Sequence, residues 1–329
     1  MLILNACDVE RALPVADAIA ALRRAFAEVA AGDYQMPPRT HLPIPPHGDT
    51  TLIMPALLGR GAGQSLSVKV VSLFGGNLDR GLARIQAAVL VLDTTTGRPL
   101  AVLEGATLTA IRTAAASALA TDLLARTGSR RLAIFGAGVQ AAWHVRAICE
   151  VRKLESVRIY APSPERRDRL AADLAGRGPV PEDVRAAKSA AEALESADIV
   201  CSVTTSSVPV FDDQDLGEGA HVNAVGSYQP TVCEIPAETV RRALVVVDER
   251  EAAWAEAGDL IQALEAGVID RDHVQADLAE LVTGVHAGRA DRSQVTLFKS
   301  VGLAIEDAAA ARAALERARR DHLGQEVDW

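Results

Sequence analysis

Residues Arg130–His144 read RRLAIFGAGVQAAWH, which is a short apolar run followed by a glycine-rich turn and a helical pattern. The apolar run, Leu132–Phe135, predicts a parallel strand that is buried on both faces. In the turn, the spacing G-x-G-x-x-A lets one glycine take a positive φ and lets the backbone at the other approach a pyrophosphate. The helix that follows would point its free N–H groups and the positive end of its dipole at the same place. The stretch therefore predicts a dinucleotide phosphate site made by Gly136, Ala137, Gly138, Val139 and Gln140.

The end of the next predicted strand, Val157–Tyr160, indicates which dinucleotide is preferred. An NAD site carries Asp or Glu at this strand end, about 20 residues beyond the glycines, to bind the ribose 2′-hydroxyl. This chain has Ala161 there, followed by Ser163, Arg166 and Arg167. A hydroxyl and guanidinium groups suit a 2′-phosphate, so we expect NADPH as the cofactor. Ser163 and Arg166 would bind part of it. NADH remains possible. The alternative is that Arg166 and Arg167 are only solvated side chains of the following helix.

The alternation of short apolar runs and helical patterns continues after this point. Strands are predicted at 183–186, 198–204, 221–226 and 244–248, with amphipathic helices after the last of them. This alternation is typical of an α/β fold with a Rossmann-type, doubly wound parallel sheet. Ligands of such sheets bind at the carboxyl ends of the strands. The residues predicted to line a nicotinamide pocket are therefore Thr204, Thr205, Gly226 and Ser227.

Composition and charge limit the class of protein. The chain has 329 residues, enough for two domains, and it is 49% hydrophobic but only 3% aromatic, as a soluble α/β protein would be. The formal net charge of −9 argues against a nucleic acid or an anionic membrane as partner. Cys7, Cys149, Cys201 and Cys233 are scattered without C-x-x-C spacing, so neither a metal site nor a disulfide framework is predicted. Since the N-terminus also lacks a signal-peptide pattern, we expect a cytoplasmic protein.

The N-terminal part predicts a different kind of domain. A short strand at 2–4 is followed by one helix that runs to about Ala31. Next comes a segment at 36–49, MPPRTHLPIPPHGD, whose prolines hold the backbone extended. It carries Arg39, His41 and His47. Arg39 is either a surface charge, which residue type alone favours, or a clamp for an anion.

Short strands dominate the next stretch and contain one conspicuous cation. They are predicted at 51–57, 65–74, 83–93 and 100–105, with turns between the later ones, which favours an antiparallel or mixed sheet. Lys69 lies in the middle of an otherwise apolar strand. A buried lysine is costly without a carboxylate partner. Lys69 therefore lies either on a solvent-facing side or in a site that depresses its pKa, and the alternation leaves both interpretations open.

Arg112 lies near the start of an alanine-rich helix that begins at Thr107. A cation there opposes the helix dipole, which is easier to understand if Arg112 neutralises a bound carboxylate or phosphate. The alternative is a solvated arginine on a long helix. A last helix, LAIEDAAAARAALERARR at 303–320, has no strand partner of its own and is expected to pack back against the first domain.

Six motifs together resemble the ornithine cyclodeaminase/mu-crystallin family over essentially the whole chain. They are M-P-P-R at 36–39, V-K-V at 68–70, A-I-R-T-A-A-A-S-A at 110–118, G-A-G-V-Q at 136–140, N-A-V-G-S at 223–227 and Q-V-T-L-F-K-S-V-G at 294–302. The resemblance implies a substrate-binding and dimerisation domain, residues 1–115 plus 300–329, a Rossmann domain, residues 116–299, and a homodimer. It also implies that Arg39, Lys69 and Arg112 hold the substrate carboxylate and face the nicotinamide. The cofactor contacts that it adds are Arg112, Val225, Ser300 and Val301.

Departures from the family pattern narrow the predicted chemistry. Cyclodeaminases of the family have an aspartate where this chain has Tyr228 and a glutamate where it has Leu52. Loss of both carboxylates removes the groups that would bind and deprotonate a diamine, which disfavours cyclodeamination. The run Gly226–Pro230 is instead similar to the family's reductases of cyclic ketimines. Arg84 stands where the family often has threonine, and its role stays open.

From these residues and this resemblance we expect an NAD(P)H-dependent imine reductase. Hydride would pass from the nicotinamide to the C=N carbon of a small imino acid, such as Δ1-pyrroline-2-carboxylate or Δ1-piperideine-2-carboxylate, giving L-proline or L-pipecolate. Arg39 and Arg112 would pair with the carboxylate, and Lys69 would be the catalytic residue that supplies or relays a proton. Three alternatives remain: a reversible alanine or N-alkyl amino acid dehydrogenase, an ornithine cyclodeaminase, and a non-catalytic NADPH-binding protein.

Overall fold

The computed structural model describes residues 1–46 and 48–329, so His47 of the proline-rich segment lies outside the described residues. Contacts between residues divide the chain into two units. The first unit is Met1–Thr113 with Leu303–Trp329, and the second is Ala114–Gly302. Helix α3 (Gly105–Leu124) begins in the first unit and ends in the second. Each unit is built on a sheet of its own.

The second unit contains an eight-stranded sheet whose strand pairs are all parallel, in the order β10-β9-β8-β11-β12-β15-β13-β14. Its strands are β8 (Arg131–Phe135), β9 (Ser156–Tyr160), β10 (Val184–Ala186), β11 (Ile199–Ser202), β12 (His221–Ala224), β13 (Leu244–Val247), β14 (Val274–Asp277) and β15 (Thr296–Lys299). Every residue of β11, β12, β13 and β15 is buried, as expected for strands that are covered on both faces. The predicted doubly wound parallel sheet is confirmed.

Helices link these strands. They are α4 (Val139–Val151), α5 (Pro164–Leu174), α6 (Ala190–Leu194), α7 (Ala237–Arg242), α8 (Arg250–Glu256), α9 (Gly258–Glu265) and α10 (Leu278–Thr283). Alanine, valine and leucine side chains from the helices and strands form one continuous core, with Phe135 and Phe211 in contact at 5.5 Å between ring centroids. The scarcity of aromatic residues is thus compensated by close packing of small side chains.

The amphipathic helices predicted after residue 248 are present as α8, α9 and α10, but β14 and β15, which also lie there, were not predicted. The sequences of the two strands, VQAD and TLFK, contain too many polar residues to stand out as apolar runs. The polar member Lys299 is fully buried, and its Nζ lies 2.8 Å from Asp259 Oδ2. Asp259 is far from Lys299 in the sequence, and its negative charge offsets the cost of burying a lysine in this sheet.

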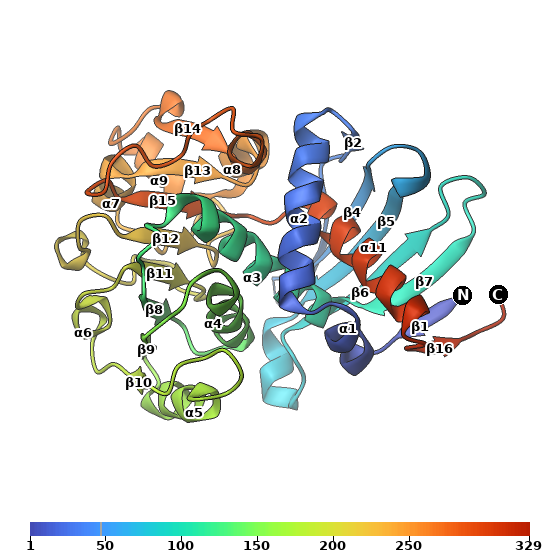
Figure 1. Ribbon diagram of the computed structural model, residues 1–329, viewed down its shortest axis with the longest axis horizontal. Helices are drawn as coiled ribbons and strands as arrows, with labels where there is room; N and C mark the ends of the chain where they lie inside the picture. The colour runs from blue at the N-terminus through green and yellow to red at the C-terminus, as the bar shows by residue number, and fades with distance from the viewer. Residues whose placement is uncertain (47) are drawn as a thin grey trace. The chain divides into compact units, whose positions relative to one another are not determined.

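The first unit contains a mixed sheet, as expected. Its order is β16-β1-β7-β6-β5-β4-β2, and β3 also pairs with β4. The strands are β1 (Leu2–Leu4), β2 (Tyr34–Gln35), β3 (Thr40–Ile44), β4 (Asp49–Leu58), β5 (Ser65–Leu73), β6 (Ile85–Leu92), β7 (Pro99–Glu104) and β16 (Gln325–Glu326). Part of the proline-rich segment is therefore an edge strand, where a missing N–H is tolerated. Because β1 pairs with both β7 and β16, the two ends of the chain lie side by side (Figure 1).

Three helices complete the first unit: α1 (Ala6–Ala12), α2 (Val15–Ala30) and α11 (Ala304–Arg320). The single helix predicted up to Ala31 is in fact two, because Pro14 has no N–H to donate and takes the N-cap position of α2. The last helix, α11, lies across β4, β5 and β6 and packs beside α2 (Figure 1). It brings residues from the end of the chain onto strands from its beginning.

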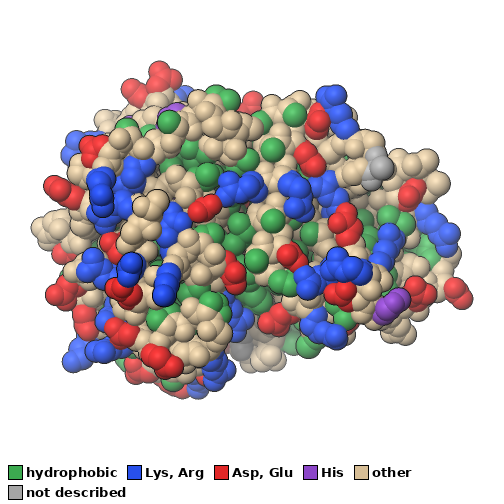
Figure 2. Space-filling model, viewed as in Figure 1, with side chains coloured by type: hydrophobic (Ala, Val, Ile, Leu, Met, Phe, Trp, Pro, Cys, Tyr) green, Lys and Arg blue, Asp and Glu red, His purple; other side chains and the backbone are tan. Residues whose placement is uncertain are grey.

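On the face shown in Figure 2, basic and acidic side chains are interspersed, in keeping with ion pairs such as Arg158–Asp183 at 2.9 Å. Within residues 1–46 and 48–329, no helix combines the length and the apolar character that crossing a membrane would require.

Candidate active site

The glycine-rich turn has the geometry that a phosphate cradle needs. Gly136, directly after β8, has φ 111°, and a Cβ atom there would lie 3.0 Å from the carbonyl oxygen of Val203. Gly138 is the N-cap of α4 and has no side chain to cap the helix. The first N–H groups of α4 can therefore donate hydrogen bonds to a ligand. The Oε1 atom of Gln140, in the first turn, is buried without a hydrogen-bond partner. The backbone at this turn therefore fits a pyrophosphate.

The strand order of the sheet reverses at the same position. From β8 the chain runs outward through β9 and β10, and it then returns to β11 on the opposite side of β8. Ligands of doubly wound sheets bind at the carboxyl ends of the strands where the order reverses in this way. Gly136 follows β8 and Val203 follows β11, so both loops lie at this switch point.

The residues that we expect to contact the ribose follow the end of β9. Ser163 is the N-cap of α5, and its Oγ accepts a hydrogen bond from Arg166 N at 3.3 Å. The side chain of Arg167 turns back, because its Nη1 donates to Ala161 O at 3.1 Å and its guanidinium lies 6.0 Å from the ring centroid of Tyr160. The side chain of Arg166 is exposed. The side chain of Arg167 is thus held near the end of β9, whereas that of Arg166 extends into solvent.

A buried carboxylate, Glu234, ties together the loops after β11 and β12. Its Oε1 accepts hydrogen bonds from Ser202 Oγ at 2.6 Å and Thr204 N at 2.7 Å, and its Oε2 accepts one from Ser227 N at 3.1 Å. Burial raises the pKa of Glu234 above its usual range, and the nearby Lys299 charge opposes that shift. Glu234 was not predicted from the sequence, because a single glutamate after a loop carries no local signal.

Two aspartates hold the neighbouring segments. Asp259 accepts hydrogen bonds from Glu234 N at 2.6 Å and Ile235 N at 3.0 Å. Asp248 accepts from Ser300 Oγ at 3.1 Å and from Val301 N and Gly302 N at 2.7 Å each. Asp259 thus fixes the segment before α7, and Asp248, directly after β13, fixes the backbone beyond the carboxyl end of β15.

This network limits what three of the predicted cofactor residues can offer. Ser227 donates its N–H to Glu234 and its O–H to Val232 O at 2.6 Å. Ser300 and Val301 donate to Asp248, and Ser300 N also donates to Ala224 O. Any contact that Ser227, Ser300 or Val301 makes with a ligand must therefore use carbon atoms or lone pairs of oxygen. Thr205, by contrast, is exposed.

In the first unit, Lys69 and Arg112 meet in a buried cluster with two acidic residues. Lys69 Nζ lies 2.6 Å from Asp307 Oδ2, and Arg112 Nε lies 3.0 Å from Asp307 Oδ1. Arg112 Nη1 lies 2.7 Å from Glu306 Oε2. All four side chains are at most 6% exposed. The solvent-facing interpretations of Lys69 and Arg112 are therefore wrong.

Arg39 belongs to the same electrostatic environment. Burial lowers the pKa of Lys69 from its ordinary value to about 8; the Asp307 carboxylate raises it, and the charges of Arg112 and Arg39 lower it further. The structure thus brings the three cations that the sequence singled out into one region. A group of cations of this kind can bind the carboxylate of a small ligand.

Glu306 and Asp307 are the members of this cluster that sequence reasoning missed. They lie in the first turn of α11, where the helix dipole favours negative charge. A faint signal existed, because a lysine in an apolar strand requires a carboxylate partner if the lysine is buried. The sequence does not say which one, since Arg112 and Asp307 are 195 residues apart.

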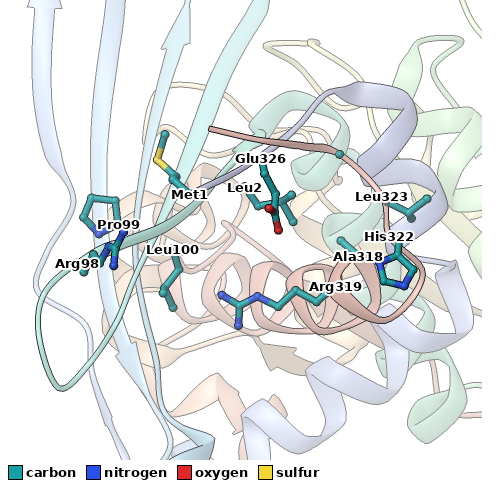
Figure 3. Close-up of a pocket in the computed structure, with 11 residues that line it drawn as sticks. Met1, Leu2, Arg98, Pro99, Leu100, Ala318, Arg319, His322, Leu323 and Glu326 are labelled. Atoms are coloured by element: carbon teal, nitrogen blue, oxygen red, sulfur yellow. The ribbon is translucent and has the colours of Figure 1, made fainter. Parts of the chain in front are cut away.

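A separate cavity of about 570 Å³ lies at the other end of α11 (Figure 3). Its lining includes Arg98, Arg319 and His322, with Glu326 as a carboxylate among them. Asp307 and Arg319 are twelve positions apart on the helix, which is about 18 Å at 1.5 Å per residue. The cavity is therefore not part of the buried cluster.

The sequence model described as the ornithine cyclodeaminase/mu-crystallin family matches residues 1–322. The chain belongs to this family. The resemblance that six short motifs indicated is thereby confirmed, and the family's fold agrees with the parallel sheet and the separate mixed sheet described above.

Within the family, the chain is similar to enzymes of imine and amino acid chemistry. A Δ1-pyrroline-2-carboxylate reductase of Bacillus cereus is 36% identical over 330 residues, covering 100% of each chain. The solved structure of the Thermococcus litoralis Δ1-pyrroline-2-carboxylate reductase, in complex with NADH and L-proline, matches with TM-score 0.95 and 40% identity over 99% of this chain and 100% of that one. An archaeal alanine dehydrogenase dimer with bound NAD matches with TM-score 0.92 and 31% identity, covering 100% of this chain and 99% of that one.

Proposed function

We propose that this family member is an enzyme that uses a reduced nicotinamide to reduce the C=N bond of a cyclic imino acid. The substrate class is Δ1-pyrroline-2-carboxylate or Δ1-piperideine-2-carboxylate, and the product is L-proline or L-pipecolate. The observation that carries the proposal is the buried Lys69, which lies among Arg39, Arg112 and Asp307 with a pKa of about 8. Such a lysine can hold a proton at neutral pH and also release it. The similar proteins named above support the same chemistry.

The residues of the cluster have distinct roles in this proposal. Arg39 and Arg112 bind the substrate carboxylate and so orient the imine. Arg112 contacts Glu306 and Asp307 through Nη1 and Nε, which leaves the N–H groups of Nη2 for that task. Lys69 gives a proton to the imine nitrogen, and a bound reduced nicotinamide supplies the hydride to the adjacent carbon. The C=N bond thereby becomes a secondary amine, and Lys69 recovers its proton from water.

NADPH is the proposed cofactor, although a similar solved structure contains NADH. The proposal rests on Ala161 in place of an acidic residue and on the exposed Arg166 beside Ser163. The pyrophosphate would bind to residues 136–140 at the start of α4. The nicotinamide end would lie near the loops of Thr204, Thr205, Val225 and Gly226.

A homodimer is proposed on the strength of one apolar sheet face. Residues of β4, β5, β6 and β7 alternate, so the face that does not carry Lys69 is lined by apolar side chains in register, such as Ile53 opposite Val70 and Val68 opposite Leu90. Ile53 and Val70 are 38% and 42% exposed. A contiguous apolar face of this kind favours contact with a second copy of the chain. Ile53→Asp should lower the mass measured by analytical ultracentrifugation to that of a monomer, and Val208→Asp, at an exposed apolar residue of the second unit, should not.

One assay tests the proposed reaction against its rivals. Oxidation of NADPH and NADH is followed with Δ1-pyrroline-2-carboxylate, with Δ1-piperideine-2-carboxylate, and with pyruvate plus ammonia or methylamine. Faster turnover of the cyclic imines supports the proposal, whereas faster turnover of pyruvate with an amine identifies an amino acid dehydrogenase. Release of ammonia from L-ornithine would identify a cyclodeaminase. Tight NADPH binding with no turnover across the panel would identify a non-catalytic binding protein.

The proposed location is a reducing cytoplasm. All four cysteines are free thiols in the structure. Burial raises the pKa of Cys149 and Cys201 to about 12, so these two thiols stay protonated and unreactive.

A further inference from the structure

Asp307 has an unusual position among the acidic residues of this protein. Its two carboxylate oxygens reach two different buried cations, Lys69 Nζ at 2.6 Å and Arg112 Nε at 3.0 Å. The Asp307 side chain is 1% exposed and lies in the first turn of α11, where the helix dipole stabilises its charge. Arg112 holds one oxygen, and the other is thereby fixed against the lysine.

We propose that Asp307 is a positioning residue that keeps Lys69 protonated and holds its Nζ in place for proton donation. This inference rests on the proposed function, because it assigns Asp307 a part in the same reaction. Asp307 does not touch the substrate. It acts through the lysine, by opposing the charges and the burial that would otherwise strip the proton from it.

The charged groups around Lys69 act in opposite directions. Arg112, from α3, and Arg39, from the segment before β3, both disfavour a positive charge on the lysine, as burial does. Asp307, from α11, is the carboxylate that favours it. The neighbouring Glu306, on the same helix turn, forms an ion pair with Arg112. Removing the charge of Asp307 therefore leaves Lys69 facing two cations in a buried position.

Protonation of Lys69 has opposite consequences for the two directions of the reaction. In reduction, hydride adds to the imine carbon, the nitrogen receives the lysine proton, and the nicotinamide is oxidised, so the ammonium form is required. In oxidation of the cyclic amino acid, the nicotinamide accepts hydride and Lys69 must accept a proton, so the neutral amine is required. Loss of the Asp307 charge should lower the pKa of Lys69 by about 1–3 units, as expected when an opposite charge in contact is removed.

The first experiment compares Asp307→Asn with Glu306→Gln. For each variant, kcat/KM is measured against pH for reduction of Δ1-pyrroline-2-carboxylate and for oxidation of L-proline. In Asp307→Asn, the alkaline limb of reduction and the acidic limb of oxidation should both move to lower pH, by about 1–3 units. Glu306→Gln removes the same charge one residue away and should move them by much less. Equal shifts in both variants, or lost activity with unmoved limbs, would overturn the proposal.

A second measurement does not depend on activity. The chain has only four lysines, Lys69, Lys153, Lys188 and Lys299, so 13C-labelled lysine side chains can be followed individually by NMR. The signal that is absent in Lys69→Arg belongs to Lys69, and its titration midpoint should fall in Asp307→Asn and return in Asp307→Glu. A midpoint that does not move refutes the role of Asp307. If the midpoint moves while no imine is reduced by the unmodified protein, the proposed function fails and the pairing of the two residues stands.

Discussion

Gly226 lies so close to the carboxylate of Glu234 that a Cβ atom at residue 226 would be 2.4 Å from Glu234 Oε2. The same atom would be 2.2 Å from the carbonyl oxygen of Thr204. Glu234 accepts hydrogen bonds from the loops after β11 and β12, and only a residue without a side chain allows those loops to approach it together. The glycine of the N-A-V-G-S motif is thus explained by packing against a buried carboxylate.

Gly226→Ala should damage the proposed nicotinamide end of the site. The added methyl group must displace backbone, which costs about 1–3 kcal/mol of folding free energy and separates the two loops. We expect a lower Tm and weaker NADPH binding, measured by thermal unfolding and by fluorescence titration. Gly217→Ala is the matched control, because nothing lies within 4 Å of a Cβ atom at that position. Equal effects of the two substitutions would contradict this interpretation.

Lys69→Met should separate binding from chemistry. Methionine fills the buried space but carries no proton, so kcat for imine reduction should fall by about 10²–10⁴-fold while the Kd for NADPH stays the same. In the unmodified protein, reduction should decline as the pH rises through about 8, because the lysine then loses its proton. Lys153→Met, at an exposed lysine, serves as control. Reduction at the parent rate by Lys69→Met would remove this residue from the mechanism.

Arg166→Glu should reverse the preference between the two nicotinamide cofactors. A carboxylate at this exposed position repels a 2′-phosphate and can accept a hydrogen bond from a 2′-hydroxyl. We expect kcat/KM with NADPH to fall by about tenfold or more relative to kcat/KM with NADH, which corresponds to about 1.4 kcal/mol. Arg169→Glu, further along the same helix, should leave that ratio unchanged. An unchanged ratio in Arg166→Glu would mean that Arg166 is a solvated side chain.

His144 should make the stability of the protein depend on pH. It is fully buried, its Nε2 lies 3.0 Å from Ser117 Oγ and its Nδ1 lies 2.8 Å from Gln140 O, and burial lowers its pKa to about 4. An unfolded histidine takes up a proton near pH 6.5, so below that pH the unfolded state binds more protons than the folded state. The contribution of His144 to the free energy of unfolding should therefore be greatest above about pH 6.5 and should decrease as the pH falls toward 4.

Urea unfolding at pH 7.5 and at pH 5.5 measures this dependence. His144→Gln should narrow the difference between the two free energies of unfolding. His322→Asn is a suitable control, since His322 is exposed and has a positive φ that asparagine tolerates. If the unmodified protein is equally stable at both pH values, the buried neutral histidine contributes nothing to the pH dependence.

The glycine-rich part of the candidate site could be predicted from the sequence, because local residue patterns determine its structure. The strand Leu132–Phe135, the turn at Gly136 and the helix after Gly138 lie within twenty residues, and each is set by apolar periodicity or by the freedom of glycine. The motifs also carried the family assignment. Lys69 and Arg112 could be identified as candidates from the sequence. A lone cation is unfavourable in an apolar strand and near the start of a helix.

The rest was decided by the tertiary structure, because it depends on pairs of residues far apart in the chain. The sequence left open whether Lys69 is buried and could not identify its partner Asp307, which the folding of α11 onto β5 brings to it. The same holds for β15, a strand whose Lys299 is acceptable only once Asp259 lies beside it. Local patterns report propensity and burial, whereas the energy of a buried charge depends on a partner that only the complete fold provides.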